Sequence, residues 1–156
     1  MAWAAKKSHR EYQRCLAKTP SRTRLRSKRV SVIVAAVLVW LSALVQHLSN
    51  ISERGTQYVV SDRSVSPPLQ GFFGRATRTL ANNIESALMW VPPMVVILIL
   101  HRTTWLSQLF AAAYICARII FALSYWLKIP VVRSLVWFAG MICCAAVTVL
   151  AVVPIG

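Results

Sequence analysis

Four long apolar runs dominate the sequence, and they constrain the fold more than any other feature. They cover about 30–48, 75–100, 104–127 and 131–153. Since an α-helix rises about 1.5 Å per residue, each run is long enough to cross a hydrocarbon layer of roughly 30 Å. The composition agrees, because 57% of the residues are hydrophobic and the mean hydropathy is +0.57. The sequence therefore predicts an all-α integral membrane protein, a bundle of four transmembrane helices.

Residues between and within these runs predict where the helices end. Pro92 and Pro93 lie inside the second run and predict a kink, because each proline removes a backbone donor. Thr103 or Thr104 can cap the third helix, and Pro130 suits the first turn of the fourth. The links between the later helices are only a few residues long, so consecutive helices should be antiparallel neighbours.

Two segments lie outside the predicted helices. Residues 1–29 carry ten of the eighteen Lys and Arg residues against one acid, which predicts a basic, largely disordered tail ahead of a membrane domain at 30–156. The tail could hold anionic headgroups or nucleic acid, but an orientation signal or an unstructured tail is favoured over both. A translation start near Val30 would remove the tail, and the sequence leaves that alternative open. The segment 49–74, with Gly55 and Gly71, is predicted to be the longest loop.

The distribution of positive charge bears on orientation in the membrane. The tail and Arg102 together place eleven basic residues on one side, against six on the other. Those six are Arg54, Arg63, Arg75, Arg78, Lys128 and Arg133. With the tail present, the positive-inside rule puts the N-terminus in the cytoplasm; without the tail it reverses the orientation. The sequence leaves both orientations open.

Four cysteines lack the spacing of metal ligands, and three of them lie inside apolar runs. A thiol in such a run packs as a small hydrophobic group. The sequence therefore predicts neither a disulfide framework nor a metal site.

Polar residues at membrane depth are costly and usually face a bundle interior or a water-filled cavity. Arg75, Arg78, Asn82 and Glu85 follow one another at steps of three, four and three, so they share one stripe of the second helix. Glu85 is the only acid within the four runs and needs a cation or several donors. Arg118 lies in the third run, and we expect it to pair with Glu85.

The antiparallel arrangement brings the start of the second helix, the end of the third and the start of the fourth to one membrane face. That face gathers Arg75, Arg78, Asn82, Tyr125, Arg133 and Ser134. Such a group suits a small anionic ligand, because an Arg fork matches a carboxylate. A thiol, whose ordinary pKa is about 8.5, shifts towards the thiolate beside a guanidinium and a hydroxyl donor. Contact with lipid phosphates is an alternative for Arg75 or Arg133 alone, but it does not explain Asn82 and Glu85.

Together these residues resemble a known family. The pattern Arg75-x-x-Arg78-x-x-x-Asn82-x-x-Glu85, then Arg118 with Tyr125 seven residues later, then Arg133-Ser134 opening the last helix, is similar to the MAPEG family, the membrane-associated proteins in eicosanoid and glutathione metabolism. The resemblance covers about 67–140 and is greatest to the bacterial branch, which implies an inner-membrane location. It also implies subunits of four helices that assemble as homotrimers, with glutathione bound between adjacent subunits.

The resemblance implies residue roles and an activity. Arg133 and Ser134 would be the catalytic pair at the glutathione sulfur. Glutathione would be bound by Arg75, Arg78, Asn82, Glu85, Arg118 and Tyr125. The implied activity is that of a glutathione-dependent transferase or peroxidase, acting on lipophilic electrophiles or hydroperoxides. A non-catalytic, oligomeric membrane protein on the same scaffold is the alternative. Two departures are Asn83, where an aspartate is common, and Phe121, where some members have a histidine.

Overall fold

The computed structural model describes residues 22–62, 68–102 and 104–153, and every regular element within these ranges is a helix. The helices are α2 (Arg22–Val60), α3 (Gly71–Ile99), α4 (Trp105–Trp126) and α5 (Pro130–Val152). All four are long and apolar enough to cross a membrane. The predicted bundle of four transmembrane helices is confirmed.

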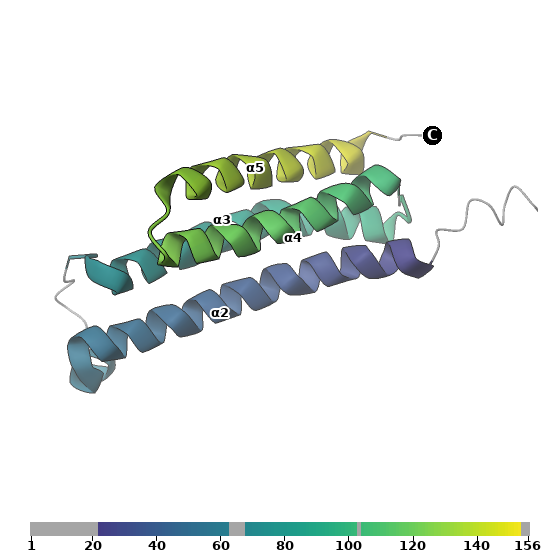
Figure 1. Ribbon diagram of the computed structural model, residues 1–156. Coiled ribbons are helices and arrows are strands. Elements are labelled where there is room, and N and C mark those ends of the chain that lie inside the picture. The colour runs from purple at the N-terminus through teal and green to yellow at the C-terminus, as the bar shows by residue number, and fades with distance from the viewer. Residues whose placement is uncertain (1–21, 63–67, 103, 154–156) are drawn as a thin grey trace, which may run out of the picture.

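The helices are arranged with α3 and α4 between α2 and α5 (Figure 1). α2 packs against α3 and α4, and α5 packs against the same two helices. Within the described ranges, α2 and α5 do not contact each other. Consecutive helices run antiparallel, so the start of α3, the end of α4 and the start of α5 meet at one end of the bundle (Figure 1).

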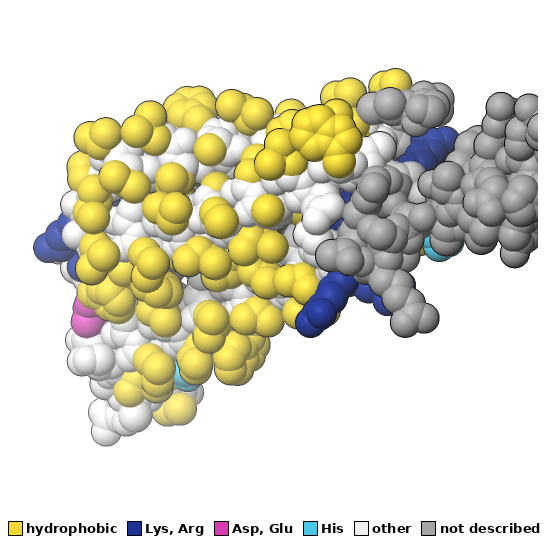
Figure 2. All heavy atoms as spheres, turned by 45° about the vertical axis from the view of Figure 1, so that its right-hand side comes forward, with side chains coloured by type: hydrophobic (Ala, Val, Ile, Leu, Met, Phe, Trp, Pro, Cys, Tyr) yellow, Lys and Arg dark blue, Asp and Glu magenta, His cyan; other side chains and the backbone are white. Residues whose placement is uncertain are grey.

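The outside of the bundle is apolar. Hydrophobic side chains cover the face shown in Figure 2, and Lys and Arg side chains gather towards the ends. Trp40 and Ile142, for example, are each 64% exposed. An apolar surface of this extent is unfavourable in water and is covered by lipid in a membrane. The chain is thus an integral, multi-pass membrane protein.

The core lies where α3, α4 and α5 meet. The ring of Trp90 stacks on that of Tyr114, with centroids 4.0 Å apart and planes 3° from parallel. Cys143 and Cys144 are each 4% exposed and pack in this core with Val147. The two thiols lie among apolar groups, as the sequence predicted.

α2 is longer than the first apolar run in both directions. Its part before the kink at Gly55, residues 22–54, rises about 50 Å at 1.5 Å per residue, so it projects beyond a hydrocarbon layer of roughly 30 Å. Residues 22–29 are helical, so the predicted disordered tail is wrong there; residues 1–21 lie outside the described ranges. The reason is that extending an existing helix needs no new nucleation, even for a basic segment.

The predicted loop at 49–74 is also wrong over its first half, because α2 continues to Val60. Ser49 and Asn50, residue types typical of loops, are buried on the inner face of α2 at 6% and 5% exposure. The helix bends instead at Gly55, whose φ of 79° is left-handed and favours glycine.

The ends of the other helices follow the sequence closely. Thr104 caps α4 through a capping box with Ser107, and Pro130 occupies the first turn of α5. α3 continues as one helix through Pro92 and Pro93. The predicted cap at Thr104 and the predicted first-turn position of Pro130 are both confirmed.

α3 and α4 end in the same backbone motif. After each helix one residue, His101 or Lys128, adopts a left-handed backbone with φ of 52° or 61°. The amide of the following residue, Arg102 or Ile129, donates back to the carbonyl of the residue five positions earlier. This is the Schellman motif, in which glycine is the usual residue at the left-handed position. His101 and Lys128 therefore each hold a strained backbone.

The start of α3 is held by the end of α2. The carboxylate of Glu53 accepts hydrogen bonds from the amides of Phe72, at 3.1 Å, and Phe73, at 2.9 Å. These amides have no partner within the helix, and the positive end of the helix dipole favours a carboxylate. The preceding turn lies against Gly74, where a Cβ would be 2.4 Å from the carbonyl oxygen of Leu69.

We therefore expect Gly74→Ala to displace the turn before α3 and to lower stability by about 1–3 kcal/mol, because the added methyl group meets backbone. Gly140→Ala is the matched control, since a Cβ there meets only the Arg118 side chain, at 3.7 Å. Thermal unfolding in detergent measures both. Equal melting temperatures for the two variants would contradict the tight packing at Gly74.

Candidate functional site

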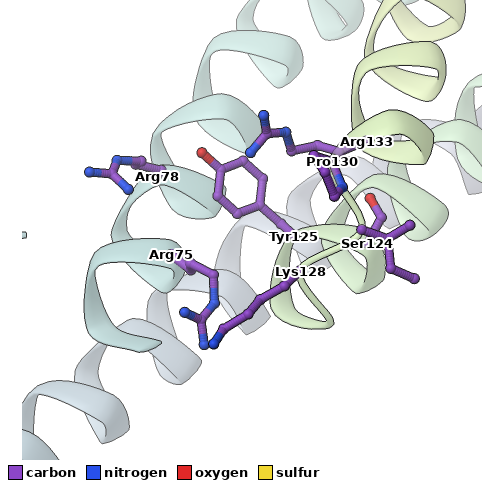
Figure 3. A pocket seen from close by; sticks show the side chains of 8 residues that line it. Arg75, Arg78, Ser124, Tyr125, Lys128, Pro130 and Arg133 are labelled. Atoms are coloured by element: carbon purple, nitrogen blue, oxygen red, sulfur yellow. The ribbon is translucent and has the colours of Figure 1, made fainter. Parts of the chain in front are cut away.

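Two adjoining clefts open at the end of the bundle where α3, α4 and α5 meet. The first has a volume of about 350 Å³ and is lined by Arg75, Arg78, Ser124, Tyr125, Lys128, Ile129, Pro130 and Arg133 (Figure 3). The second, of about 240 Å³, is lined by Asn82, Phe121, Tyr125, Arg133, Ser134, Trp137 and Phe138. Tyr125 and Arg133 line both, so they form the boundary between the two clefts.

α3 contributes three polar side chains from one stripe. Arg78 donates a hydrogen bond from Nη2 to the carbonyl of Leu69, at 3.3 Å. Asn82 donates from Nδ2 to the carbonyl of Arg78, one turn back, at 3.0 Å. Arg75 donates from Nη1 to the carbonyl of Gly71, at 3.0 Å. Each of these bonds is to nearby backbone, so further donors of Arg78 and Asn82 can serve a ligand.

The centre of the site is an arginine over a tyrosine ring. The guanidinium carbon of Arg133 lies 4.8 Å from the ring centroid of Tyr125, and Phe121 meets that ring edge-on at 5.5 Å. The next residue, Ser134, donates its hydroxyl proton to the carbonyl of Pro130, at 3.1 Å. Arg133 and Ser134 thus place a cation and a hydroxyl side by side on the first turn of α5.

The charge of the site is entirely positive. Four cationic side chains line the first cleft, and no acidic residue is among its described lining residues. Like charges in one cleft repel each other, and an anion bound between them removes that repulsion. The second cleft differs, because Phe121, Trp137 and Phe138 supply apolar walls. The geometry suits an anionic ligand in one cleft and an apolar group in the other.

The comparison with known families fits this arrangement. The MAPEG family model matches residues 29–153. The chain belongs to the MAPEG family. The match spans the whole of α3, α4 and α5, and therefore all residues of the two clefts. No curated protein and no solved structure matched the chain.

Six of the eight residues predicted for the site of this MAPEG protein line the two clefts. They are Arg75, Arg78, Asn82, Tyr125, Arg133 and Ser134. Glu85 and Arg118 line neither cleft as described. Glu85 is exposed on the surface of α3, whereas Arg118 is 3% exposed inside the bundle.

The expected ion pair between Arg118 and Glu85 is wrong. Arg118 donates from Nη2 to the backbone carbonyl of Asn82, at 3.0 Å, and to the side-chain oxygen of Asn83. Asn83 lies one position along from Asn82 and turns inward, where it is 3% exposed. Arg118 thus joins α4 to α3 inside the bundle, and its partner is an amide.

Asn83 is a structural residue, and the sequence did not lead us to predict that it binds Arg118. Its Nδ2 donates to the hydroxyl of Ser42 on α2, at 2.7 Å, while its oxygen accepts from Arg118. Spacing could have revealed it, because Thr79, Asn83 and Ser86 continue to the buried Trp90 at steps of four, three and four. This stripe is the buried face of α3.

Ser124 and Lys128 also line the first cleft and were not predicted to do so. Ser124 is buried and donates to the carbonyl of Phe121, at 2.9 Å. Lys128 lies beyond the end of α4, in the short connection between Tyr125 and Arg133, and this position in the sequence was the available signal.

We expect Asn83→Ala to lower stability by about 2–3 kcal/mol, because the buried guanidinium of Arg118 loses an acceptor. Asn82→Ala is the control, since Arg118 uses only the backbone carbonyl of Asn82. Thermal unfolding of both variants in detergent is the measurement. A fall in melting temperature no larger for Asn83→Ala than for Asn82→Ala would contradict the role of Asn83.

Proposed function

We propose that this MAPEG protein is a membrane-bound, glutathione-dependent transferase or peroxidase. The observation that carries the proposal is the joined pair of clefts, one cationic and one with aromatic walls, with Arg133 and Ser134 where they meet. Family membership supports a glutathione-related chemistry in general terms. The adjoining apolar cleft suits a lipophilic electrophile or hydroperoxide as the second substrate.

The residues present fit glutathione. The tripeptide carries two carboxylates, an ammonium group and a thiol, so it needs cations and hydrogen-bond donors together. Arg78 and Asn82 supply a guanidinium and an amide from α3, and Tyr125 supplies a phenolic hydroxyl from α4. Arg75 lines only the first cleft, whereas Ser134 lines only the second, so we leave Arg75 out of the thiol site.

The chemistry of the proposed site depends on the protonation of the thiol, whose thiolate is the nucleophile. Arg133 stabilises negative charge on sulfur electrostatically, which favours loss of the thiol proton. Ser134 can donate its hydroxyl proton to sulfur by leaving the carbonyl of Pro130, which stays bonded within the helix. The aromatic walls exclude water from the sulfur and place an apolar substrate next to it.

We expect Arg133→Ala to lower the thiolate fraction of bound glutathione at pH 7 by about tenfold, because the loss of a nearby cation raises the thiol pKa by about one unit. The ultraviolet difference band of the thiolate, recorded during titration of the detergent-purified protein, measures it. Arg29→Ala is the control, since Arg29 is exposed at the opposite end of the bundle. An unchanged thiolate band in Arg133→Ala would move the activating role elsewhere, and no saturable binding to the wild type would refute the proposal.

Glu85 favours a second part of the proposal, the assembly of several subunits. It is exposed on the surface of α3, about 21 Å along the helix from Gly71, and therefore at membrane depth. A carboxylate facing lipid at that depth is costly, so a cationic or donor group from a neighbouring copy is its expected partner. Glu85 lines neither cleft of its own subunit. In the proposed homotrimer it therefore contacts glutathione only if the ligand lies between subunits. A non-catalytic oligomer on this scaffold would use Glu85 for assembly alone.

We expect Glu85→Gln to shift the assembly towards monomers, because the amide lacks the charge that pairs across subunits. Light scattering after size-exclusion chromatography in detergent gives the mass. Glu53→Gln is the control, since its amide oxygen can still accept the two amides at the start of α3. A Glu85→Gln protein with the mass of the wild type would exclude this role.

A further inference from the structure

The outer edge of the first cleft holds two cations that glutathione does not require. Arg75 and Lys128 both line this cleft, and Figure 3 shows their side chains reaching towards each other on the side of Tyr125 away from Arg133. Two carboxylates and a thiolate are matched by Arg78 and Arg133 together with the neutral donors of the site. Arg75 and Lys128 are therefore available to bind a second anion.

Arg75 lacks an acceptor that its position demands. Its Nε is buried and has no hydrogen-bond partner among the described residues, while Nη1 is held by the carbonyl of Gly71. The guanidinium carbon also lies 5.5 Å from the centroid of the Phe72 ring. Buried donors in proteins nearly always have a partner, so this one points to a missing acceptor nearby.

Lys128 adopts a backbone conformation that is unfavourable for lysine. It occupies the left-handed position of the Schellman motif at the end of α4, with φ of 61°, where glycine is favoured. A lysine there brings an ammonium group to the cleft at a cost in backbone strain. The flanking residues Leu127 and Ile129 are 67% and 43% exposed, so apolar surface borders the ammonium.

The edge lies where helices enter and leave the hydrocarbon layer. α3 and α5 begin here and α4 ends here, which is the level of the lipid phosphates. We propose that Arg75 and Lys128 bind the phosphate of an anionic phospholipid headgroup beside the glutathione cleft. Arg supplies a fork of donors and Lys a compact charge, the two groups that bind phosphate oxygens. Leu127 and Ile129 contact the glycerol and acyl carbons. This site goes beyond the proposed glutathione function and rests on it only in assigning Arg78 and Arg133 to glutathione.

The test uses the whole protein in a neutral detergent. Native mass spectrometry titrations with short-chain phosphatidylglycerol, phosphatidylcholine and inorganic phosphate give the affinities. We expect Lys128→Gly to weaken phosphatidylglycerol binding about fivefold, as expected for one basic residue near a lipid surface, and Arg75→Gln to weaken it similarly. Lys128→Gly relieves backbone strain, so its melting temperature without lipid should equal or exceed that of the wild type.

His101→Gly is the matched control, because His101 occupies the same motif at the opposite end of the bundle. It should leave phosphatidylglycerol binding unchanged. Wild-type affinity in both Lys128→Gly and Arg75→Gln would overturn the proposal. Binding of inorganic phosphate as tight as that of phosphatidylglycerol would assign the edge to a soluble anion and overturn the lipid assignment.

A glutathione titration of the same samples separates the two proposals. Displacement of phosphatidylglycerol by saturating glutathione would place both ligands in one site and overturn the separate edge site. Simultaneous binding supports it. If glutathione does not bind at all, the proposed function fails while the lipid affinities still decide the edge site.

Discussion

A buried guanidinium connects the four helices of this bundle. Arg118 of α4 donates to the carbonyl of Asn82 and to the side chain of Asn83 on α3, and Asn83 donates in turn to Ser42 on α2. Gly140 of α5 packs on the other side of Arg118, where a Cβ would lie 3.7 Å from its Cδ. Hydrocarbon offers no water to replace these partners, so a shift of any helix would leave a buried charge or amide unsatisfied. The rest of the structure depends on this contact.

The site depends on it through the rotation of α3. Each residue of an α-helix turns the side chain by about 100°, so fixing Asn83 inward directs Asn82 towards the clefts. Arg75 and Arg78 lie on the same face of α3 as Asn82, whereas Thr79 lies with Asn83 on the buried face. Asn82 belongs both to the contact with Arg118 and to the site, because its carbonyl accepts from Arg118 while its side chain lines the second cleft. Arg118 therefore acts on the site by positioning α3.

The sequence predicts the spans and caps of this fold well, because hydropathy and cap chemistry are local. Thr104 and Pro130 mark their helix starts without reference to any other segment. The extent of α2 could not be predicted in the same way. Its basic beginning and its polar end at Ser49 and Asn50 resemble tail and loop, and only packing against the bundle shows the latter pair to be buried in a helix.

The candidate site was predictable as a group but not in its internal pairings. Antiparallel topology alone brings together the start of α3, the end of α4 and the start of α5, and six of the predicted side chains line the clefts there. The partner of Arg118 was not predictable, because charge favours Glu85 while the rotation of α3 favours Asn83. Helix geometry decides, since the two residues lie on different faces of α3, one exposed and one buried. The preference for opposite charge does not bring the two side chains together, because the carboxylate faces outward.

The electrostatics of the clefts explain why an anion is the expected ligand. α3 and α5 both begin at this end, and the N-terminus of a helix carries a partial positive charge. At the start of α3 the carboxylate of Glu53 already accepts from the first amides, but no acid lies in the first turn of α5, where Arg133 adds to a field of its own sign. Such placement is unfavourable for helix stability by a few tenths to about 1 kcal/mol. Among the four cations described in the lining of the first cleft, Lys128 alone lies at the end of a helix, where the dipole favours a cation. A chain selected for stability alone would place an acid in the first turn of α5, whereas an anion bound from outside is attracted both by Arg133 and by the start of the helix.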